Sequence, residues 1–298
     1  MNNTNNQNGA LVSVVMPCYN DGDYILESIE SVKRQKYSNI ELIIVDDGST
    51  DEKTVDILDS IDEDNIAVYR IENSGPSKAR NYAISQSRGA YILPLDADDL
   101  IDSTYIEKAV SVLEKNSSVG VVYCKADSFG SKDRSWTIPD YSFEKMIVDN
   151  IVFVTAVFRK SDWEAVGGFC TDFHNGMEDY DFWLSILETE KTILQIPETL
   201  FHYRLKETSR TTNFIEDQDK VNETYRQLYL RHKDFFHMHY DEYAILLRKA
   251  FIDIHFDMFL LQAKVEEYRR AYEHMEKFKK IPGLMPLYSL FLKLFRGK

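Results

Sequence analysis

Short apolar runs alternate with segments of helical spacing between residues 11 and 124 of this 298-residue chain, and this alternation constrains the fold more than any other feature. The runs are rich in β-branched residues and predict strands at 11–16, 41–45, 66–71, 91–95 and 119–124. Between the first two runs, Ile25, Ile29 and Val32 fall on one helical stripe. Repeated strand and helix units of this length predict an α/β fold, a doubly wound and mostly parallel sheet with helices on both faces.

Polar residues follow three of these predicted strands at the point where each strand ends. They are residues 17–20, 46–49 and 96–99, and the last two groups are rich in aspartate. In parallel sheets of this kind, ligands bind beyond the carboxyl ends of the strands. The sequence therefore predicts that three strand ends converge on one acidic rim.

The pattern changes along the rest of the chain. Residues 126–160 are less regular, although 151–158 is apolar enough to predict another buried strand, and 178–187 has the spacing of a helix. Beyond residue 213 come long, charged helical stretches with many Tyr and Phe. We expect a disordered N-terminus over 1–10, an α/β domain over 11–213 and a helical C-terminal appendage over 214–298.

Composition excludes several classes of protein. The formal net charge of -14 disfavours a nucleic-acid binder, because phosphate backbones require clustered positive charge. Three widely spaced cysteines fit neither a zinc site nor a disulfide framework, so we expect reduced core residues. No apolar run approaches the roughly 18–20 residues that span a bilayer, and the polar first residues lack the apolar segment of a signal peptide. These features predict a cytoplasmic location.

Asp96, Asp98 and Asp99 directly follow the predicted strand at 91–95. Hard divalent cations such as Mg²⁺ and Mn²⁺ prefer carboxylate oxygens and commonly share a substrate diphosphate, so aspartates at a strand end suit a metal-diphosphate site. The alternative is an acidic turn that caps a helix beginning near Ser103.

Five motifs in order carry a resemblance to a known family. They are Val14-Val15-Met16-Pro17-Cys18-Tyr19-Asn20, Ile44-Val45-Asp46-Asp47-Gly48-Ser49-Thr50-Asp51, Gly75-Pro76-Ser77-Lys78-Ala79-Arg80-Asn81 ahead of the Asp96 cluster, Gly167-Gly168-Phe169 and Glu178-Asp179-Tyr180-Asp181-Phe182-Trp183. Together they closely resemble the family-2 glycosyltransferases of the GT-A fold, over roughly residues 11–210. The resemblance implies metal-dependent transfer of a sugar, a hexose or an N-acetylhexosamine, from a nucleotide-diphosphate donor such as a UDP-sugar. It also implies a saccharide or lipid-linked saccharide acceptor in bacterial surface-polysaccharide biosynthesis.

The resemblance also implies roles for residues of the donor site. Tyr19 and Asp47 would flank the nucleobase, and the Asp47 carboxylate would accept from a uracil-like N–H. Asp96 would lie near the ribose. Arg80 would supply positive charge towards the donor, with a surface salt bridge as the alternative.

For the metal, the resemblance implies a Mn²⁺ or Mg²⁺ ion. Asp98 occupies the leading ligand position of the family's Asp-x-Asp motif, and Asp99 could share the ion. His202 lies in a predicted strand where related enzymes sometimes place a metal-contacting or phosphate-contacting side chain. A structural histidine is the alternative there.

Asp179 matches the family's general base, and Glu178 precedes it in the substrate site. An acceptor hydroxyl must lose its proton as it attacks, which requires one positioned carboxylate or imidazole. A helix N-terminus favours the ionised form of Asp179 whereas partial burial raises its pKa, and the sequence leaves this balance open. A single base without a second nucleophile favours one displacement with inversion. His174, just ahead, could line the acceptor pocket.

Two other functions fit parts of the sequence. A nucleotidyltransferase also uses aspartates and a metal on a doubly wound sheet, but such enzymes usually carry a Gly-rich, basic loop after the first strand. A non-catalytic nucleotide-sugar-binding protein would have no need to retain both the Asp98 cluster and Asp179. Dehydrogenase and P-loop motifs are absent from the sequence.

The last residues of the chain carry a separate pattern. Between residues 284 and 295, apolar residues recur at helical spacing opposite a polar and basic side, after Lys277, Lys279 and Lys280. This pattern is typical of a helix that lies on an anionic membrane surface, so we expect peripheral contact with the inner face of the plasma membrane. The alternative is that the stripe packs on the protein's own helical appendage.

Overall fold

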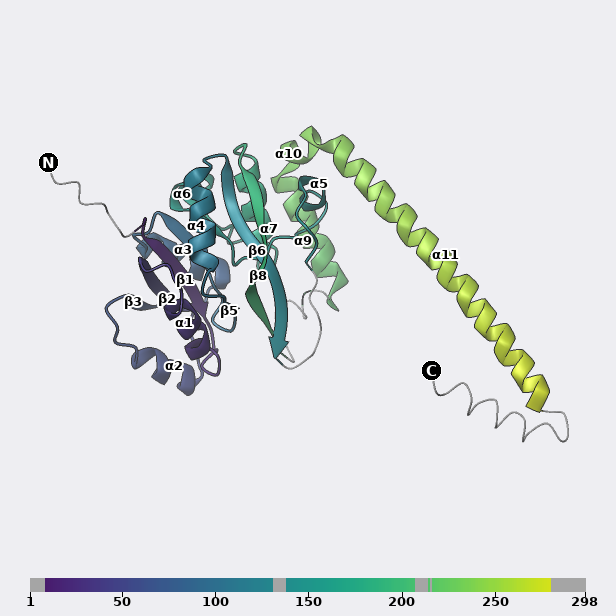
Figure 1. The fold of residues 1–298 in the computed structure, drawn as a ribbon, viewed down its shortest axis with the longest axis horizontal. Coiled ribbons are helices and arrows are strands. Elements are labelled where there is room, and N and C mark those ends of the chain that lie inside the picture. The colour runs from purple at the N-terminus through teal and green to yellow at the C-terminus, as the bar shows by residue number, and fades with distance from the viewer. Residues whose placement is uncertain (1–8, 131–137, 207–213, 215, 280–298) are drawn as a thin grey trace. The chain divides into compact units, whose positions relative to one another are not determined.

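Eight strands form one mixed sheet in the order β3-β2-β1-β4-β7-β6-β8-β5 (Figure 1), in a computed structural model that describes residues 9–130, 138–206, 214 and 216–279. The strands are β1 (Val12–Cys18), β2 (Ile40–Asp46), β3 (Ile66–Arg70), β4 (Tyr91–Pro94), β5 (Leu100–Ile101), β6 (Val119–Gly130), β7 (Val157–Arg159) and β8 (Thr192–Leu205).

The N-terminal half of the sheet is parallel and contains the point where strand order reverses. β1 pairs with β2 on one side and β4 on the other, and β2 pairs with β3. Parallel crossovers are right-handed. Because β4 lies on the other side of β1 from β2 and β3, the β3–β4 connection lies on the opposite face of the sheet from the β1–β2 and β2–β3 connections. The predicted fold is therefore confirmed, and the carboxyl ends of β1, β2 and β4 lie side by side.

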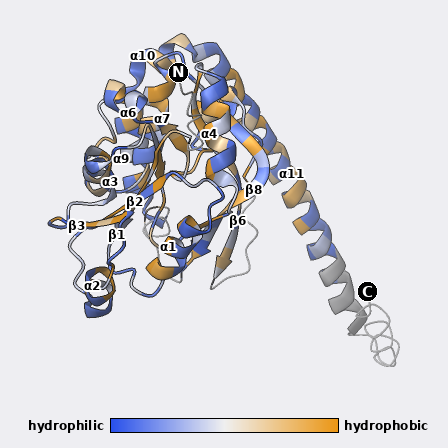
Figure 2. Ribbon diagram, turned by 60° about the vertical axis from the view of Figure 1, so that its left-hand side comes forward, coloured by the Kyte–Doolittle hydropathy of each residue, from blue (hydrophilic) through white to orange (hydrophobic). Residues whose placement is uncertain are grey.

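Helices connect the strands of this sheet and follow it along the chain. They are α1 (Ile25–Lys33), α2 (Glu52–Asp59), α3 (Pro76–Gln86), α4 (Tyr105–Lys115), α5 (Phe143–Met146), α6 (Lys160–Val166), α7 (Glu178–Leu187), α9 (Gln218–Arg231), α10 (Lys233–Met238) and α11 (Tyr240–Lys279). α3 packs on β1 and β2, α4 on β6 and β7, and α7 on β6 and β8. Figure 2 shows the hydrophobic residues along the strands, where β1 and β2 are almost wholly buried.

The predicted strand at 151–158 is wrong for most of its length, because only β7 joins the sheet. Its apolar side chains are buried as expected, but two of its carbonyls accept from side chains and not from a neighbouring strand. The indole N–H of Trp183 donates to the carbonyl of Val152 at 3.1 Å, and the hydroxyl of Tyr105 donates to that of Thr155 at 2.7 Å. Burial alone therefore did not distinguish a strand from an irregular buried segment.

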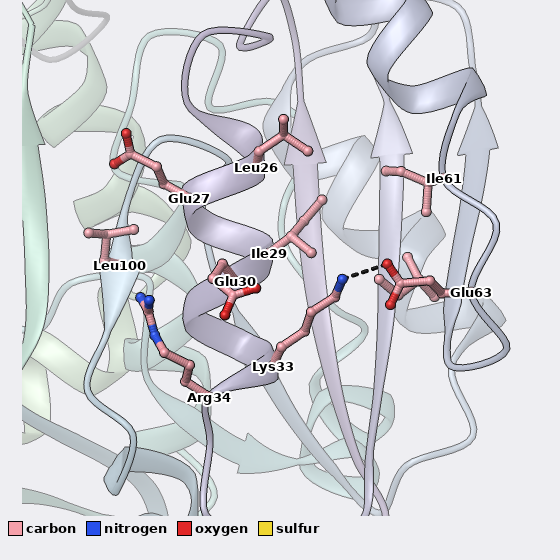
Figure 3. Close-up of a pocket in the computed structure, with 10 residues that line it drawn as sticks. Leu26, Glu27, Ile29, Glu30, Lys33, Arg34, Ile61, Glu63 and Leu100 are labelled. Atoms are coloured by element: carbon pink, nitrogen blue, oxygen red, sulfur yellow. Dashed lines mark hydrogen bonds and ion pairs between the residues drawn. The ribbon is translucent and has the colours of Figure 1, made fainter.

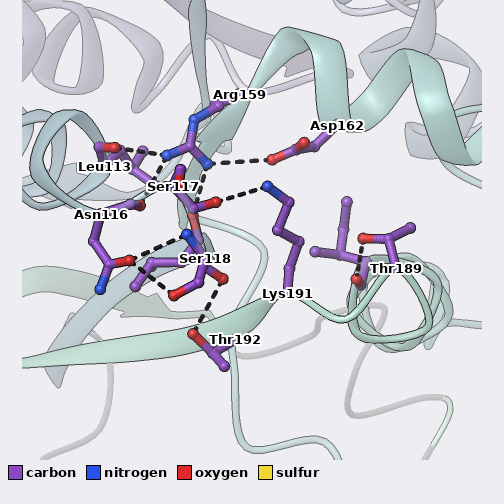
Figure 4. A network of polar contacts seen from close by, with 11 residues as sticks. Leu113, Asn116, Ser117, Ser118, Arg159, Asp162, Thr189, Lys191 and Thr192 are labelled. Carbon is purple, nitrogen blue, oxygen red and sulfur yellow. Dashed lines mark hydrogen bonds and ion pairs between the residues drawn. The ribbon is translucent and has the colours of Figure 1, made fainter.

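Arg159, at the end of β7, fastens several elements together (Figure 4). Its guanidinium donates to the carbonyl oxygens of Leu113 and Val119, both at 2.6 Å, and to that of Asn116 at 3.1 Å. Two of these carbonyls lie at the C-terminal end of α4, where a cation complements the helix dipole. One side chain thus joins α4, β6 and β7.

The chain divides into two compact units, residues 1–240 and 241–298. The boundary expected near residue 213 lies before this division, because α9 and α10 pack within the first unit. Tyr225 donates to Asp149 at 2.6 Å, and the ring of Phe235 lies 6.1 Å from that of Phe143. The second unit, taken by itself, contains the described part of α11.

A buried ion cluster holds α9 against α7. His232 directly follows α9, is 2% exposed, and lies 3.0 Å from the carboxylate of Asp181 and 2.8 Å from that of Glu188. Arg231 also reaches Asp181, at 2.6 Å. Burial lowers the pKa of His232, but its hydrogen bonds to the two carboxylates outweigh burial and raise that pKa above its ordinary value.

Some predictions lie outside the described residues. These are the disordered N-terminus up to residue 8, residues 131–137 of the less regular region and the amphipathic tail at 284–295. Within the described part of the chain, no helix has both the length and the apolar character needed to cross a bilayer. Cys18 and Cys124 are buried free thiols, as predicted, and burial raises the pKa of each to about 12.

We predict that His232→Gln lowers stability in a pH-dependent way. A group whose pKa is raised on folding stabilises the fold below its unfolded pKa of about 6.5, and this contribution is lost as pH rises through the folded value. The free energy of unfolding of the variant should be about 1–3 kcal/mol lower than that of the native protein at pH 6, in the range for charged hydrogen bonds. Thermal denaturation between pH 6 and 9 measures the difference, which should shrink towards pH 9. A constant difference across this range would contradict the prediction, and exposed His255→Gln serves as the control.

Candidate active site

The loops after β1 and β2 are tied together at the rim of the sheet. The side-chain oxygen of Asn20 accepts from the backbone N–H of Thr50 at 2.8 Å and of Asp51 at 3.0 Å, and the Asn20 backbone N–H donates to Ser49 Oγ at 3.0 Å. Asn20 has a positive φ of 57°, which asparagine tolerates better than most residues. Next to it, the ring of Tyr19 is 46% exposed, which leaves an aromatic surface at the rim.

Asp47 anchors the turn that precedes α3. Its two carboxylate oxygens accept from the backbone N–H groups of Ser74 and Gly75, each at 2.8 Å. Gly75 has a φ of 88°, a conformation that favours glycine, and Pro76 begins the helix immediately afterwards. The buried carboxylate therefore sets the direction of α3, and with it the position of Arg80.

Arg80 bridges two acidic residues that belong to distant parts of the chain. Its guanidinium donates to Asp96 at 2.7 Å and to Glu178 at 2.8 Å. Arg80 is only 3% exposed, so the alternative of a surface salt bridge is wrong. Burial lowers the pKa of Arg80, but the two carboxylates outweigh burial and raise it above its ordinary value. The bridge brings the end of β4 and the start of α7 to one place.

Asp179 follows Glu178 in the first turn of α7. Its carboxylate accepts from the backbone N–H of Tyr180 at 2.8 Å. Burial is the largest influence on this group and the charge of Glu178 the next, and together they raise the pKa of Asp179 to about 7, against the opposing effect of Arg80. In the balance left open by the sequence, burial therefore outweighs the helix N-terminus, and the Asp179 carboxyl exchanges its proton near neutral pH.

Asp98 and Asp99 lie in a turn fastened to β8 by Arg204. The backbone N–H of Arg204 donates to the carboxylate of Asp99 at 2.7 Å, and its Nε donates to the carbonyl of Asp98 at 2.7 Å. The Arg204 guanidinium also lies over the rings of Tyr24 and Phe129. Asp99 is buried in this arrangement, whereas the Asp98 carboxylate forms an ion pair with Lys206 Nζ at 2.7 Å. Lys206 also reaches Asp21 at 2.6 Å.

Three carboxylates are crowded around this turn. Burial, followed by the charge of Asp96, raises the pKa of Asp98, and burial, followed by the charges of Asp98 and Asp96, raises that of Asp99. A bound divalent cation would relieve this repulsion, and the Asp98 carboxylate already faces a positive charge. Asp98 therefore fits a divalent cation whose remaining ligands include substrate oxygens.

The structure does not gather the three predicted metal ligands into one cluster. In the described ranges, no group of three or more His, Cys, Asp and Glu side chains is arranged to hold a metal ion. His202 Nδ1 lies 2.6 Å from the carboxylate of Asp127, so this histidine joins β8 to β6. His174, in the loop before α7, is exposed.

Sequence reasoning missed two residues that organise the site. Lys206 received no role because it follows a predicted strand without any motif. Asn81 belongs to the motif at residues 75–81, but only its contacts in the structure show its role. Its amide accepts from Trp163 and from the backbone of Phe169, and it donates to the Phe169 carbonyl. A Cβ at Gly168 would lie 2.8 Å from the Asn81 amide oxygen, which explains the glycine there.

A separate surface pocket lies on α1 and the segment before β3 (Figure 3). Leu26, Ile29 and Ile61 line it together with the Lys33–Glu63 ion pair at 2.5 Å. Its lining contains none of the predicted site residues. The candidate site is therefore the rim itself and not this pocket.

The fold and the rim define a class of protein: a GT-A type α/β domain with carboxylates at the ends of adjacent parallel strands. Residues 13–171 match the family described as glycosyl transferase family 2. The chain belongs to this family.

Relatives and solved structures agree with this assignment. An uncharacterised glycosyltransferase of Rickettsia typhi is 32% identical over 70% of this chain and 68% of its own length. The putative teichuronic acid biosynthesis glycosyltransferase TuaG of Bacillus subtilis is 32% identical over 73% of this chain and 88% of its own. The Staphylococcus aureus TarS fragment 1-349 in complex with UDP-GlcNAc shares the fold, with a TM-score of 0.59 and 20% identity over 74% of this chain and 66% of that one.

Other relatives are much longer than the matched region. The chain spans 23% of an uncharacterised protein of Sinorhizobium fredii and 49% of the glycosyltransferase GlyG of Streptococcus pneumoniae. The similarity thus concerns the α/β domain that these proteins share.

We predict that Asp179 titrates near pH 7 and that Glu178→Gln lowers its pKa. The substitution removes the charge that opposes ionisation of Asp179 and leaves the Arg80 cation nearby, and both changes favour the carboxylate. Carbon-13 NMR of labelled aspartate side chains measures the titration, with Asp179→Asn identifying the resonance. An unchanged or higher pKa in Glu178→Gln would contradict this explanation. Exposed Glu190→Gln should leave the titration as it is.

Proposed function

We propose that this chain is an inverting, metal-dependent glycosyltransferase. It transfers a hexose or N-acetylhexosamine from a UDP-sugar to a saccharide or lipid-linked saccharide. The observation that carries the proposal is the position of Asp179, a carboxylate with a pKa of about 7, beside a Glu178–Arg80–Asp96 bridge that ends at the acidic rim.

The donor would bind across the ends of β1, β2 and β4, at the reversal of strand order. The exposed ring of Tyr19 offers a stacking surface for the nucleobase. Each carboxylate oxygen of Asp47 accepts one backbone hydrogen bond and can accept a second, so Asp47 can also receive a base N–H. Asp96, held by Arg80, would accept a hydrogen bond from a ribose hydroxyl.

Asp98 would hold the divalent cation. The ion would offset the negative charge that develops on the departing diphosphate. Lys206, which faces Asp98, adds positive charge at the same place. Asp99 is buried and His202 pairs with Asp127, whereas the Asp98 carboxylate is partly exposed beside Lys206. We therefore propose Asp98 with substrate oxygens as the ligand set.

In the reaction, the acceptor hydroxyl would donate its proton to the ionised carboxylate of Asp179 as its oxygen bonds to the anomeric carbon. The bond from that carbon to the diphosphate oxygen breaks on the opposite side, and the electron pair leaves with the diphosphate. One displacement with one base inverts the configuration. A base with a pKa of about 7 suits this step, because about half of it is ionised at neutral pH and the carboxylate still takes a proton.

The choice of donor and acceptor class draws on the relatives. TarS was solved in complex with UDP and with UDP-GlcNAc, and TuaG is named for teichuronic acid biosynthesis. Chondroitin synthase of Escherichia coli is 31% identical over 60% of this chain and 26% of its own length. These names support a nucleotide-sugar donor and a role in polysaccharide biosynthesis.

We predict that Asp98→Asn removes most Mn²⁺-dependent binding of UDP. The amide keeps the volume of the side chain but lacks the charge that a hard cation requires. The Mn²⁺-dependent part of the affinity should fall about 10–100-fold, the range found when groups that support a metal site are removed. Isothermal titration with and without Mn²⁺ measures it. Native, Mn²⁺-responsive affinity in the variant would refute Asp98 as the ligand, and Asp140→Asn, at an exposed ion pair with Lys125, is the control.

We also predict that Asp179→Asn retains UDP and Mn²⁺ binding but lowers the transfer rate about 10²–10⁴-fold, the usual effect of losing a general base. In the native protein the rate should fall below about pH 7, because the base must be ionised. Transfer to a saccharide acceptor, followed over a range of pH, provides the measurement. Turnover close to native in Asp179→Asn would place the base elsewhere. Asp172→Asn, exposed in the preceding loop, is the matched control.

A further inference from the structure

α11 carries an apolar seam with a strict seven-residue repeat. Successive apolar positions are three and four residues apart without interruption, and they are Ala244, Leu247, Phe251, Ile254, Met258, Leu261, Val265 and Tyr268. An ordinary α-helix has 3.6 residues per turn, so a 3.5-residue repeat drifts by about 20° per heptad on a straight helix. A repeat that is kept this long is the pattern of helices that supercoil around each other.

Among the described residues of its own unit, 241–279, the seam has no partner element. α11 is a helix of 40 residues, and from Leu247 to Tyr268 the large side chains of the seam are 42–70% exposed. Helices in proteins owe most of their stability to packing of an apolar face, and large exposed apolar patches mark interaction sites. The described part of the second unit holds no second element that covers this face.

Polar residues flank the seam and distinguish it from the other side of the helix. Arg248, Asp257 and Lys264 lie next to seam positions, as expected beside a coiled-coil interface. Apolar residues also occur on the opposite side, at Ile252 and Phe259, but there the spacing is broken by charged residues such as Lys249 and Glu266.

Further along, Glu266 forms ion pairs with Arg269 at 3.4 Å and with Arg270 at 3.9 Å. These side chains therefore form a solvated face, and only the seam runs uninterrupted from Ala244 to Tyr268.

We propose that α11 is a self-association helix, whose seam packs against the same seam of a second copy of this chain in a coiled coil. The seam extends over 25 residues, or about 37 Å at 1.5 Å per residue. The described helix is not apolar enough to cross a membrane, and charges recur along it. A second copy supplies the matching seam that the strict repeat requires, independently of the reaction proposed for the first unit.

Sedimentation equilibrium of the full-length chain tests this proposal. The native protein should have twice the monomer mass of 34.8 kDa. The seam variant Ile254→Glu with Leu261→Glu should have the monomer mass, because each copy would bury two uncompensated charges in the interface. The matched control Ile252→Glu with Phe259→Glu adds the same charges to the same stretch of helix on the opposite side, and it should keep the native mass.

Two further measurements separate loss of association from loss of folding. UDP binding in the presence of Mn²⁺ reports on the first unit, and the thermal transition reports on folding of the chain. Both should stay close to native in the two double variants at temperatures below the transition.

A monomeric native chain would overturn the proposal. Equal loss of association in the seam variant and the control would also overturn it, because the seam would then have no special role. Association that is lost only in the control would assign the interface to the opposite side of α11.

Discussion

The rest of the candidate site depends on the contact of the buried Arg80 guanidinium with two carboxylates, of which Glu178 is buried and Asp96 is partly exposed. Arg80 lies on α3, Asp96 follows β4, and Glu178 begins α7, so one guanidinium joins three elements. Removing one partner of a buried ion pair leaves an unpaired charge and typically costs about 3–5 kcal/mol. The bridge is therefore a strong constraint on the distance between the rim and the start of α7, which is also the distance between the proposed donor site and the proposed base.

The same bridge influences the chemistry of Asp179. Burial and the Glu178 carboxylate raise the pKa of Asp179, and the Arg80 cation opposes them. Glu178 neutralises part of the charge of Arg80, so the balance settles at about 7 and not at the low value of an aspartate beside a free guanidinium. The bridge thus affects both the position and the basicity of Asp179, although burial has the larger effect on its pKa.

Much of this arrangement could be predicted from the sequence because it follows from local patterns. Alternation of apolar runs and helical stripes predicts the parallel strands, and the strand-end rule then predicts the rim. The partners of Arg80 could not be predicted in this way, since Glu178 lies 98 residues further along the chain. The contact of Lys206 with Asp98 could not be predicted either, because it depends on the pairing of β8 with β6 and β5. The sequence does not distinguish the irregular segment before β7 from a strand, because its side chains are buried like those of a strand. The carbonyls of Val152 and Thr155 accept from distant side chains instead of a neighbouring strand.

α7 is held at more than its first turn. Two residues after Asp179, Asp181 is 1% exposed and receives Arg231 and His232 from the end of α9. The indole of Trp183 on the same helix donates to the backbone of the irregular segment at Val152. Ion pairs from two sides and a buried indole thus fix the rotation of α7 about its axis. Since the direction of the Asp179 carboxylate depends on that rotation, α9 belongs functionally with the α/β unit, although its sequence resembles the helical region that follows.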